Sequence, residues 1–133
     1  MDIKKAWYRV SVKALIYNDE WDFLLCKEDN WVWDIPGGWL DHWESIDVCI
    51  TRELQEEMWL EVTYINTIPK YFVTAHKPES KTRPWLVNVF YEVKVKNLNF
   101  TPSDECIEIK FFNKETVKSV KTIVNVDEFV KQL

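Results

Sequence analysis

The chain has 133 residues and is poor in glycine. It contains two glycines, whereas an average chain of this length, with about 7% glycine, would have roughly nine. Apolar runs of the length that a membrane-spanning helix needs, about 20 residues, are also missing. No secretory signal is visible at residues 1–6. We therefore expect a protein that does not act at a membrane.

The chain has three cysteines, and its acidic residues outnumber its basic ones. The three cysteines, Cys26, Cys49 and Cys106, are odd in number and widely spaced, which favours reduced thiols in a cytoplasmic protein over disulfides or zinc ligands. The net charge of −5 argues against binding to duplex nucleic acid. A phosphate substrate stays open, because a bound metal ion can reverse the local field. The length fits one domain over residues 1–133, as a monomer or a homodimer.

A helix is predicted between Ser45, a plausible N-cap, and Trp59, because an apolar residue recurs at every fourth position. Glu53, Glu56 and Glu57 fall on neighbouring positions of one surface of this helix. Like charges at this spacing cost about 0.2–0.5 kcal/mol per pair. The cluster therefore needs a cation, and oxygen ligands favour a hard ion such as Mg²⁺. A solvated acidic helix face is the alternative.

The rest of the chain predicts an α+β fold. Strand patterns precede the central helix, further strands follow it, and the C-terminus is helical. Thr74–Pro84 has loop composition, and its cations Lys77, Lys81 and Arg83 could hold distal phosphates. The predicted strands are 9–17, 23–26, 32–35, 62–73 with a break at Pro69, 85–95 and 106–112, and the predicted later helices are 115–120 and 126–133.

The stretch 37–60 resembles the signature of the Nudix hydrolase family. That signature is Gly, five residues, Glu, seven residues, then Arg-Glu-U-x-Glu-Glu-x-Gly-U, where U is aliphatic. Trp59 is the one departure, since it stands where the family has Gly. The matching residues are Gly38, Glu44, Arg52, Glu53, Leu54, Glu56, Glu57 and Leu60.

The resemblance implies an α/β/α sandwich with a mixed β-sheet and a loop–helix–loop catalytic motif. It also implies metal-dependent hydrolysis of a diphosphate linkage in a nucleoside diphosphate derivative, with Mg²⁺ or Mn²⁺ as cofactor. Glu53, Glu56 and Glu57 would be the metal ligands, and Glu53 could instead be the base. Arg52 and Glu44 would pair and orient the carboxylates.

Two further parts of the site are expected beside the helix. Glu105 lies in the loop before the last predicted strand, where this family often supplies an extra carboxylate. Gly37 and Gly38 would let backbone N–H groups approach phosphate. Two alternatives stay open: a domain of the same fold that binds a nucleotide or a partner without turnover, and an unrelated acidic α+β interaction domain.

Tryptophan is as abundant as glycine is rare, with eight residues. Trp21 and Trp31 stand at predicted turns, and Asn-Gly in place of Asn30-Trp31 would form a type I′ hairpin. Trp43 and Trp59 stand where the Nudix family usually has Gly. A non-glycine residue in the left-handed region costs roughly 1–2 kcal/mol. Either this is an aromatic-rich protein, or these four tryptophans are glycine in the native source, through UGA codons translated as Trp.

Overall fold

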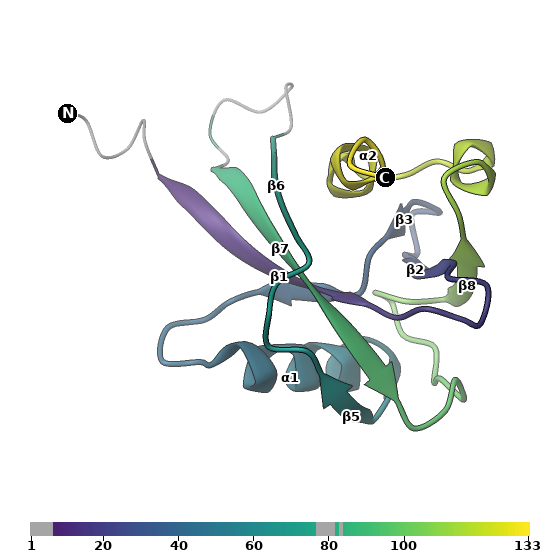
Figure 1. Ribbon diagram of the computed structural model, residues 1–133, viewed down its shortest axis with the longest axis horizontal. Coiled ribbons are helices and arrows are strands. Elements are labelled where there is room, and N and C mark those ends of the chain that lie inside the picture. Colours follow the sequence, from purple (N-terminus) through teal and green to yellow (C-terminus); the bar gives the residue numbers. More distant parts are fainter. Residues whose placement is uncertain (1–6, 77–81, 83) are drawn as a thin grey trace.

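The computed structural model describes residues 7–76, 82 and 84–133 (Figure 1). None of the helices within this part of the chain is both long and apolar enough to cross a membrane. The elements in chain order are β1 (Tyr8–Leu15), β2 (Phe23–Lys27), β3 (Trp33–Asp34), β4 (Gly37–Trp39), α1 (Ile46–Met58), β5 (Val62–Ile65), β6 (Tyr71–Ala75), β7 (Trp85–Val95), β8 (Glu108–Phe112), the 3-10 helix η2 (Thr116–Ser119) and α2 (Val124–Val130).

The larger sheet is mixed, as predicted. Its order is β4-β1-β7-β5, with β6 also paired to β7. β1 runs parallel to β7 along its whole length, and the other pairs in this sheet are antiparallel. A smaller antiparallel sheet has the order β3-β2-β8. The predicted α+β class is confirmed.

The two α-helices lie on opposite sides of the long β1–β7 pair (Figure 1). Alternate residues of β7 face opposite layers. Phe90 packs with Phe129 of α2, whereas Tyr91 and Val93 belong to the cluster that contains Ile50 and Leu54 of α1. This alternation follows from the two-residue period of a strand.

Both faces of β1 are buried along Ser11–Leu15. Ser11 and Lys13 are 2% and 3% exposed, although they alternate with the apolar Val12 and Ala14. The reason is the parallel pairing with β7, which places β1 inside the sheet with protein on both faces. The polar residues that alternate along β1 are therefore buried. One of them, Lys13, lies next to the site described below.

The motif region departs from prediction in two details. Gly37–Trp39 was expected to be loop but forms strand β4, paired with Ser11–Lys13 of β1. Ser45 does precede α1, but its hydroxyl donates to Asp47 Oδ1 at 2.6 Å instead of capping the helix.

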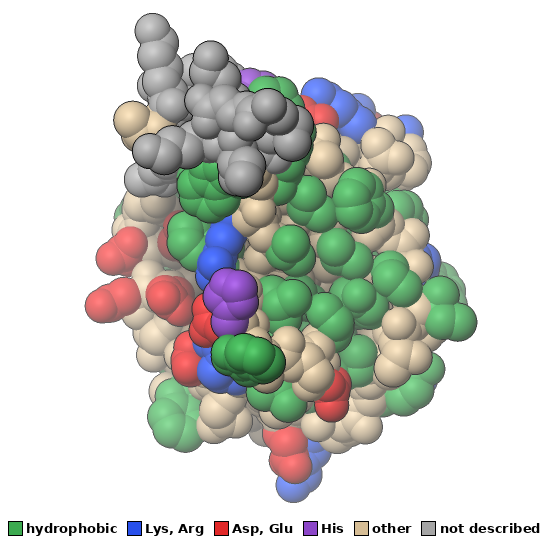
Figure 2. Space-filling model, turned by 90° about the vertical axis from the view of Figure 1, so that its left-hand side faces the viewer, with side chains coloured by type: hydrophobic (Ala, Val, Ile, Leu, Met, Phe, Trp, Pro, Cys, Tyr) green, Lys and Arg blue, Asp and Glu red, His purple; other side chains and the backbone are tan. Residues whose placement is uncertain are grey.

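The remaining boundaries are close to those predicted. β7 has the predicted bounds, and β5 and β6 are separated at the predicted break. The segment predicted as helix 115–120 is a single 3-10 turn, and α2 begins two residues earlier than expected. Hydrophobic side chains reach the surface over much of one face (Figure 2). In the described part of the chain as a whole, the exposed large hydrophobic residues include Trp21, Trp31, Trp43, Trp59, Ile68 and Phe72.

Candidate active site

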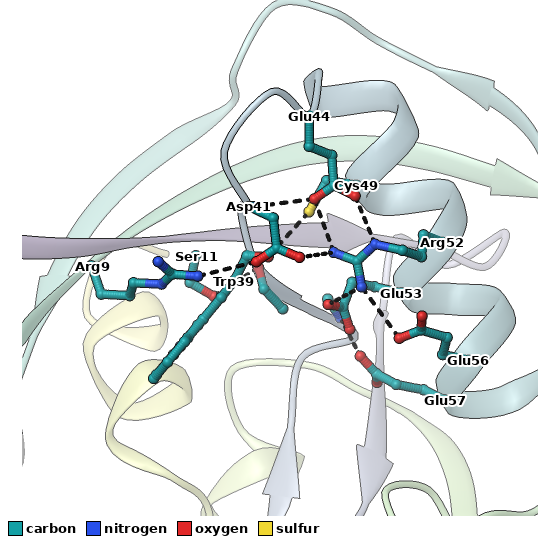
Figure 3. Close-up of polar contacts among 12 residues, drawn as sticks. Arg9, Ser11, Trp39, Asp41, Glu44, Cys49, Arg52, Glu53, Glu56 and Glu57 are labelled. Carbon is teal, nitrogen blue, oxygen red and sulfur yellow. Dashed lines mark hydrogen bonds and ion pairs between the residues drawn. The ribbon is translucent and has the colours of Figure 1, made fainter.

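Arg52 is the centre of an ion-pair network beside α1 (Figure 3). Its Nε and Nη2 donate to the two carboxylate oxygens of Glu44 at 2.6 and 2.9 Å, which is a bidentate pair. Its Nη1 donates to Glu53 Oε1 at 3.0 Å and to Glu56 Oε2 at 3.2 Å. The hydrogen bond from Arg52 lowers the pKa of Glu44 to about 2. Arg52 therefore ties the loop before α1 to the carboxylates on the helix.

The three helix carboxylates have different environments. The Glu56 side chain is 56% exposed, that of Glu53 is 15% exposed, and the whole Glu57 residue is 6% exposed. The N–H of Gly37 donates to Glu57 Oε1 at 3.3 Å. The carboxyl groups of Glu53 and Glu57 also point toward each other (Figure 3). The three carboxylates share one side of the helix, but Glu57 points inward.

Burial raises the pKa of both carboxyl groups of that pair. For Glu53, burial outweighs the opposing attraction of Arg52. For Glu57, burial raises the pKa well above its ordinary range, although the nearby Lys13 opposes it. Repulsion from Glu53 and Asp34 adds to the shift of Glu57. Negative charge is therefore poorly compensated at this place, which is the condition that a bound cation relieves.

An open cavity of about 280 Å³ adjoins this pair. Five carboxylates line it, together with the backbone of β4 and the buried Cys26. The lining residues are Cys26, Glu28, Asp34, Ile35, Gly37, Gly38, Trp39, Glu53, Glu57 and Glu105. The structure thus brings Glu105 and both glycines to the same cavity as Glu53 and Glu57, from segments far apart in the sequence. Glu56, Arg52 and Glu44 are outside the lining.

Lys13 is a buried cation beside the site, and no local pattern predicted this role. Its Nζ donates to Asp34 Oδ2 at 3.4 Å and to the Ile35 carbonyl at 3.3 Å. Burial by itself lowers the pKa of Lys13, but attraction to Asp34 and Glu57 outweighs burial, so the pKa is raised. Lys13 is therefore charged and partly balances the carboxylates behind the cavity.

Glu28 and Asp34 were also missed. Glu28 has its pKa raised, mainly by burial and then by repulsion from Asp34. Both residues flank the hairpin between β2 and β3, and nothing in their local sequence separates them from solvated turn acids. The one available signal was the position of Asp34 directly before the Ile-Pro-Gly-Gly that opens the motif.

The two glycines permit close approach at two different places. A Cβ on Gly37, which has φ +137°, would lie 2.1 Å from the carbonyl oxygen of Val12. A Cβ on Gly38 would lie 2.3 Å from the carboxylate carbon of Glu53. Gly37 therefore fits β4 against β1, and Gly38 leaves the space that the Glu53 carboxylate occupies.

Two other features of the described structure lie outside this cavity. His76 stacks on Trp85 with ring centroids 3.8 Å apart. Lys77, Lys81 and Arg83 lie outside the described residues. A larger cavity, of about 590 Å³, lies between α1 and β5. Its lining includes Asp47 but none of the motif carboxylates, so we do not regard it as the active site.

The family of the chain is shown by a match that covers almost its whole length. The model of the NUDIX domain matches residues 7–133. The chain belongs to the NUDIX domain family. The predicted resemblance is confirmed, and with it the prediction of an enzyme of the Nudix hydrolase class. Enzymes of this class generally use a divalent metal ion and act on nucleotide diphosphate substrates. No protein with a curated description matches the chain.

Solved structures agree with this fold. A MutT protein from Methanosarcina mazei Go1 is 22% identical, with 94% of this chain and 91% of that chain covered and a TM-score of 0.69. An ADP-ribose pyrophosphatase from Streptococcus suis is 20% identical, with 89% and 81% covered and a TM-score of 0.63. A MutT protein from Bacillus halodurans is 18% identical, with 92% and 80% covered and a TM-score of 0.69. At these identities the likeness shows the Nudix fold.

The Nudix site of this chain has the carboxylate oxygens that a hard cation prefers, but these oxygens are not arranged around a common point. Among the described residues, no three His, Cys, Asp or Glu side chains are gathered closely enough to hold a metal ion as they stand. Glu53 and Glu57 are already adjacent. Glu56 pairs with Arg52 on the exposed side of the helix. Carboxylate oxygens alone suit Mg²⁺ or Mn²⁺, so the residues fit such an ion.

Proposed function

We propose that this Nudix protein hydrolyses the diphosphate linkage of a nucleoside diphosphate derivative in the cytoplasm, with Mg²⁺ as its metal ion and Mn²⁺ as a substitute. The observation that carries the proposal is the cavity in which Glu53 and Glu57 of α1 meet Glu105, Glu28 and Asp34 beside the backbone of Gly37 and Gly38. Five carboxylates beside one buried lysine would repel a polyphosphate unless cations came with it.

Glu53, Glu56 and Glu57 would hold the metal ion. When bound, Mg²⁺ supplies neutralisation of phosphate charge and a lowered pKa for water. Arg52 makes hydrogen bonds to three carboxylates, and we assign it a positioning role, shared with Glu44. Its guanidinium is already occupied by these carboxylates, so it is not placed to bind substrate phosphate. Lys13, buried behind the cavity, holds Asp34 and stabilises negative charge at Glu57.

The reaction needs a proton acceptor for the attacking water. The water oxygen forms a bond to one phosphorus, the bond from that phosphorus to the bridging oxygen breaks, and the bridging oxygen leaves on the other phosphate. A cavity carboxylate takes the proton of the water. Glu105 is our choice for this role, because it lines the cavity from outside the motif helix; Glu53 is the alternative.

The reading of a domain that binds without turnover rested on Trp43 and Trp59 in the motif. Neither residue lines the cavity. Both project into solvent, with Trp43 fully exposed and Trp59 62% exposed. The structure therefore offers no steric reason for a loss of turnover at these two positions, and we favour the enzyme.

The test is a panel of nucleoside triphosphates, ADP-ribose, dinucleoside polyphosphates and nucleotide sugars, assayed with Mg²⁺. Glu56→Gln should abolish metal-dependent turnover and the rise in melting temperature that Mg²⁺ binding causes. It should leave the metal-free melting temperature unchanged, because exposed substitutions cost little stability. The matched control is Glu115→Gln, on an exposed side chain beyond β8, which should retain activity and metal binding.

Glu57→Gln is a less specific test. Unlike Glu56, Glu57 is buried and close to the charged Lys13. Loss of one partner from such buried charges is itself destabilising. The proposal is wrong if the folded protein hydrolyses nothing in the panel with Mg²⁺, or if Glu56→Gln keeps near-normal turnover.

A further inference from the structure

Four tryptophans have a backbone conformation that favours glycine. Among the described residues, the non-glycine residues with positive φ are Trp21 at 64°, Trp31 at 68°, Trp43 at 66° and Trp59 at 58°. Non-glycine residues in this region are uncommon, and Asn and Asp are the usual ones. The chain has many Asn and Asp residues at its turns, yet none of those described has positive φ. All the left-handed non-glycine positions carry the same, bulky residue.

Trp21 and Trp31 occupy the same place in two similar hairpin loops. The N–H of Trp21 donates to the Asn18 carbonyl at 3.1 Å, and the N–H of Asn18 donates to the Asp22 carbonyl at 3.1 Å. The loop that contains Trp31 repeats this pattern between Glu28 and Val32, with both distances 3.0 Å. This is the loop in which a type I turn is followed by a left-handed residue, normally glycine, at a bulge.

The type I′ turn that the sequence suggested at Asn30-Trp31 is therefore wrong, because it would need positive φ at Asn30 as well. The expectation of a glycine position at residue 31 does not depend on that turn type. In both hairpins the left-handed position follows the turn, and this position is the one that excludes most side chains.

Trp43 lies in a tight turn of the motif loop. The N–H of Glu44 donates to the Asp41 carbonyl at 3.2 Å, so Trp43 is the third residue of a four-residue turn. Positive φ at the third residue defines a type II turn, in which glycine is the standard residue. This turn aims Glu44 at Arg52.

Trp59 ends the motif helix. It has φ 58° and ψ 30°, and its N–H donates to the Gln55 carbonyl at 3.1 Å. A left-handed residue with this hydrogen bond is the αL cap, which glycine commonly provides. Glycine at this position would also complete the Nudix signature.

The four side chains are mostly exposed and make few contacts that would offset this backbone strain. They are 67%, 69%, 104% and 62% exposed in chain order. Trp31 has Lys27 Nζ 4.1 Å from its ring, and Trp21 lies edge-on to Tyr17. By contrast, Trp33 has no positive φ, is 4% exposed and packs against Phe112. Trp33 thus has a packing role, whereas these four stand at glycine positions.

We infer that residues 21, 31, 43 and 59 are glycine in the protein as its native source makes it, and that the printed tryptophans come from UGA codons translated as Trp. Some bacterial genetic codes read UGA as glycine. One cause then explains both the shortage of glycine and the excess of tryptophan. The inference concerns the chain itself and holds whether or not the proposed hydrolysis is correct.

The direct test reads the gene and the native protein. We expect UGA at these four codons and glycine in the corresponding peptides by mass spectrometry, with tryptophan at Trp33 as the internal control. UGG codons, or tryptophan in the native peptides, would overturn the inference.

Variants of the protein that has tryptophan at these positions give an independent test. Trp43→Gly and Trp59→Gly should each raise the melting temperature, by about 3–8 °C for a domain of this size. Trp33→Gly, at a buried position with ordinary φ, should lower it. A lower melting temperature in both Trp43→Gly and Trp59→Gly would also overturn the inference.

Discussion

The two glycines of the motif offer a paired test, because alanine at each would meet a different neighbour. The added methyl of Gly37→Ala would lie 2.1 Å from the Val12 carbonyl oxygen and 2.9 Å from the Lys13 Cα. Both atoms belong to the backbone of β1, which is held between β4 and β7 and cannot move alone. The nearest atoms to the added methyl of Gly38→Ala would be those at the end of the Glu53 side chain. We therefore expect loss of stability in the first variant and loss of activity in the second.

The magnitude for Gly37→Ala follows from two costs. Overlap with packed neighbours costs about 1–3 kcal/mol, and an alanine at φ +137° adds about 1–3 kcal/mol of backbone strain. The smaller conformational freedom of the unfolded alanine variant offsets only about 0.4–1 kcal/mol. A net loss of about 3 kcal/mol is a large part of a typical stability of 5–15 kcal/mol, by order of magnitude. It should lower the melting temperature by about 10 °C.

Gly38→Ala should behave differently because a carboxylate can rotate. The Glu53 side chain moves out of its place beside Glu57, at a stability cost below about 1 kcal/mol. Turnover should fall at least tenfold, which corresponds to about 1.4 kcal/mol of transition-state stabilisation.

Thermal melts and Mg²⁺-dependent turnover measured on both variants decide the matter. If Gly38→Ala lowers the melting temperature as much as Gly37→Ala, or if it leaves turnover unchanged, the contacts assigned to these two glycines are wrong.

Two further predictions concern single carboxylates. Glu105→Gln should lower the turnover number severalfold and change its pH profile, with the melting temperature unchanged because the residue is exposed; identical kinetics across pH would remove Glu105 from the site. The pKa of Glu44 is lowered from an ordinary 4.5 to about 2, so its ionised form stabilises the fold above the unfolded pKa, and this contribution is lost as the pH falls toward 2. Glu44→Gln should therefore melt at a lower temperature than the unchanged protein at pH 7, and the gap should close between about pH 4 and pH 2. A gap that stays constant over that range would show that the Arg52 pair does not set the stability.

Local sequence patterns predicted the main secondary-structure elements and the motif. Period-two and period-four patterns placed β7 and α1 well, because each such element has a regular face that packs against the core. The spacing of Gly38, Glu44 and the helix carboxylates identified the family before any contact was known. The four tryptophans that stand at predicted turns or at glycine positions of the Nudix signature are the non-glycine residues with positive φ in the described part of the chain.

The sequence by itself therefore determined the family, the catalytic helix and the positions where the backbone needs glycine, since each depends on residues close together in the chain. Only the tertiary structure decided that Lys13 is buried as the counter-charge, that Glu57 points inward, and that Glu28 and Asp34 join Glu53 at one cavity. These facts depend on the parallel pairing of β1 with β7 and on the hairpin that carries Asp34 back toward α1. Burial and long-range charge arise from such contacts between distant segments, and no local pattern encodes them.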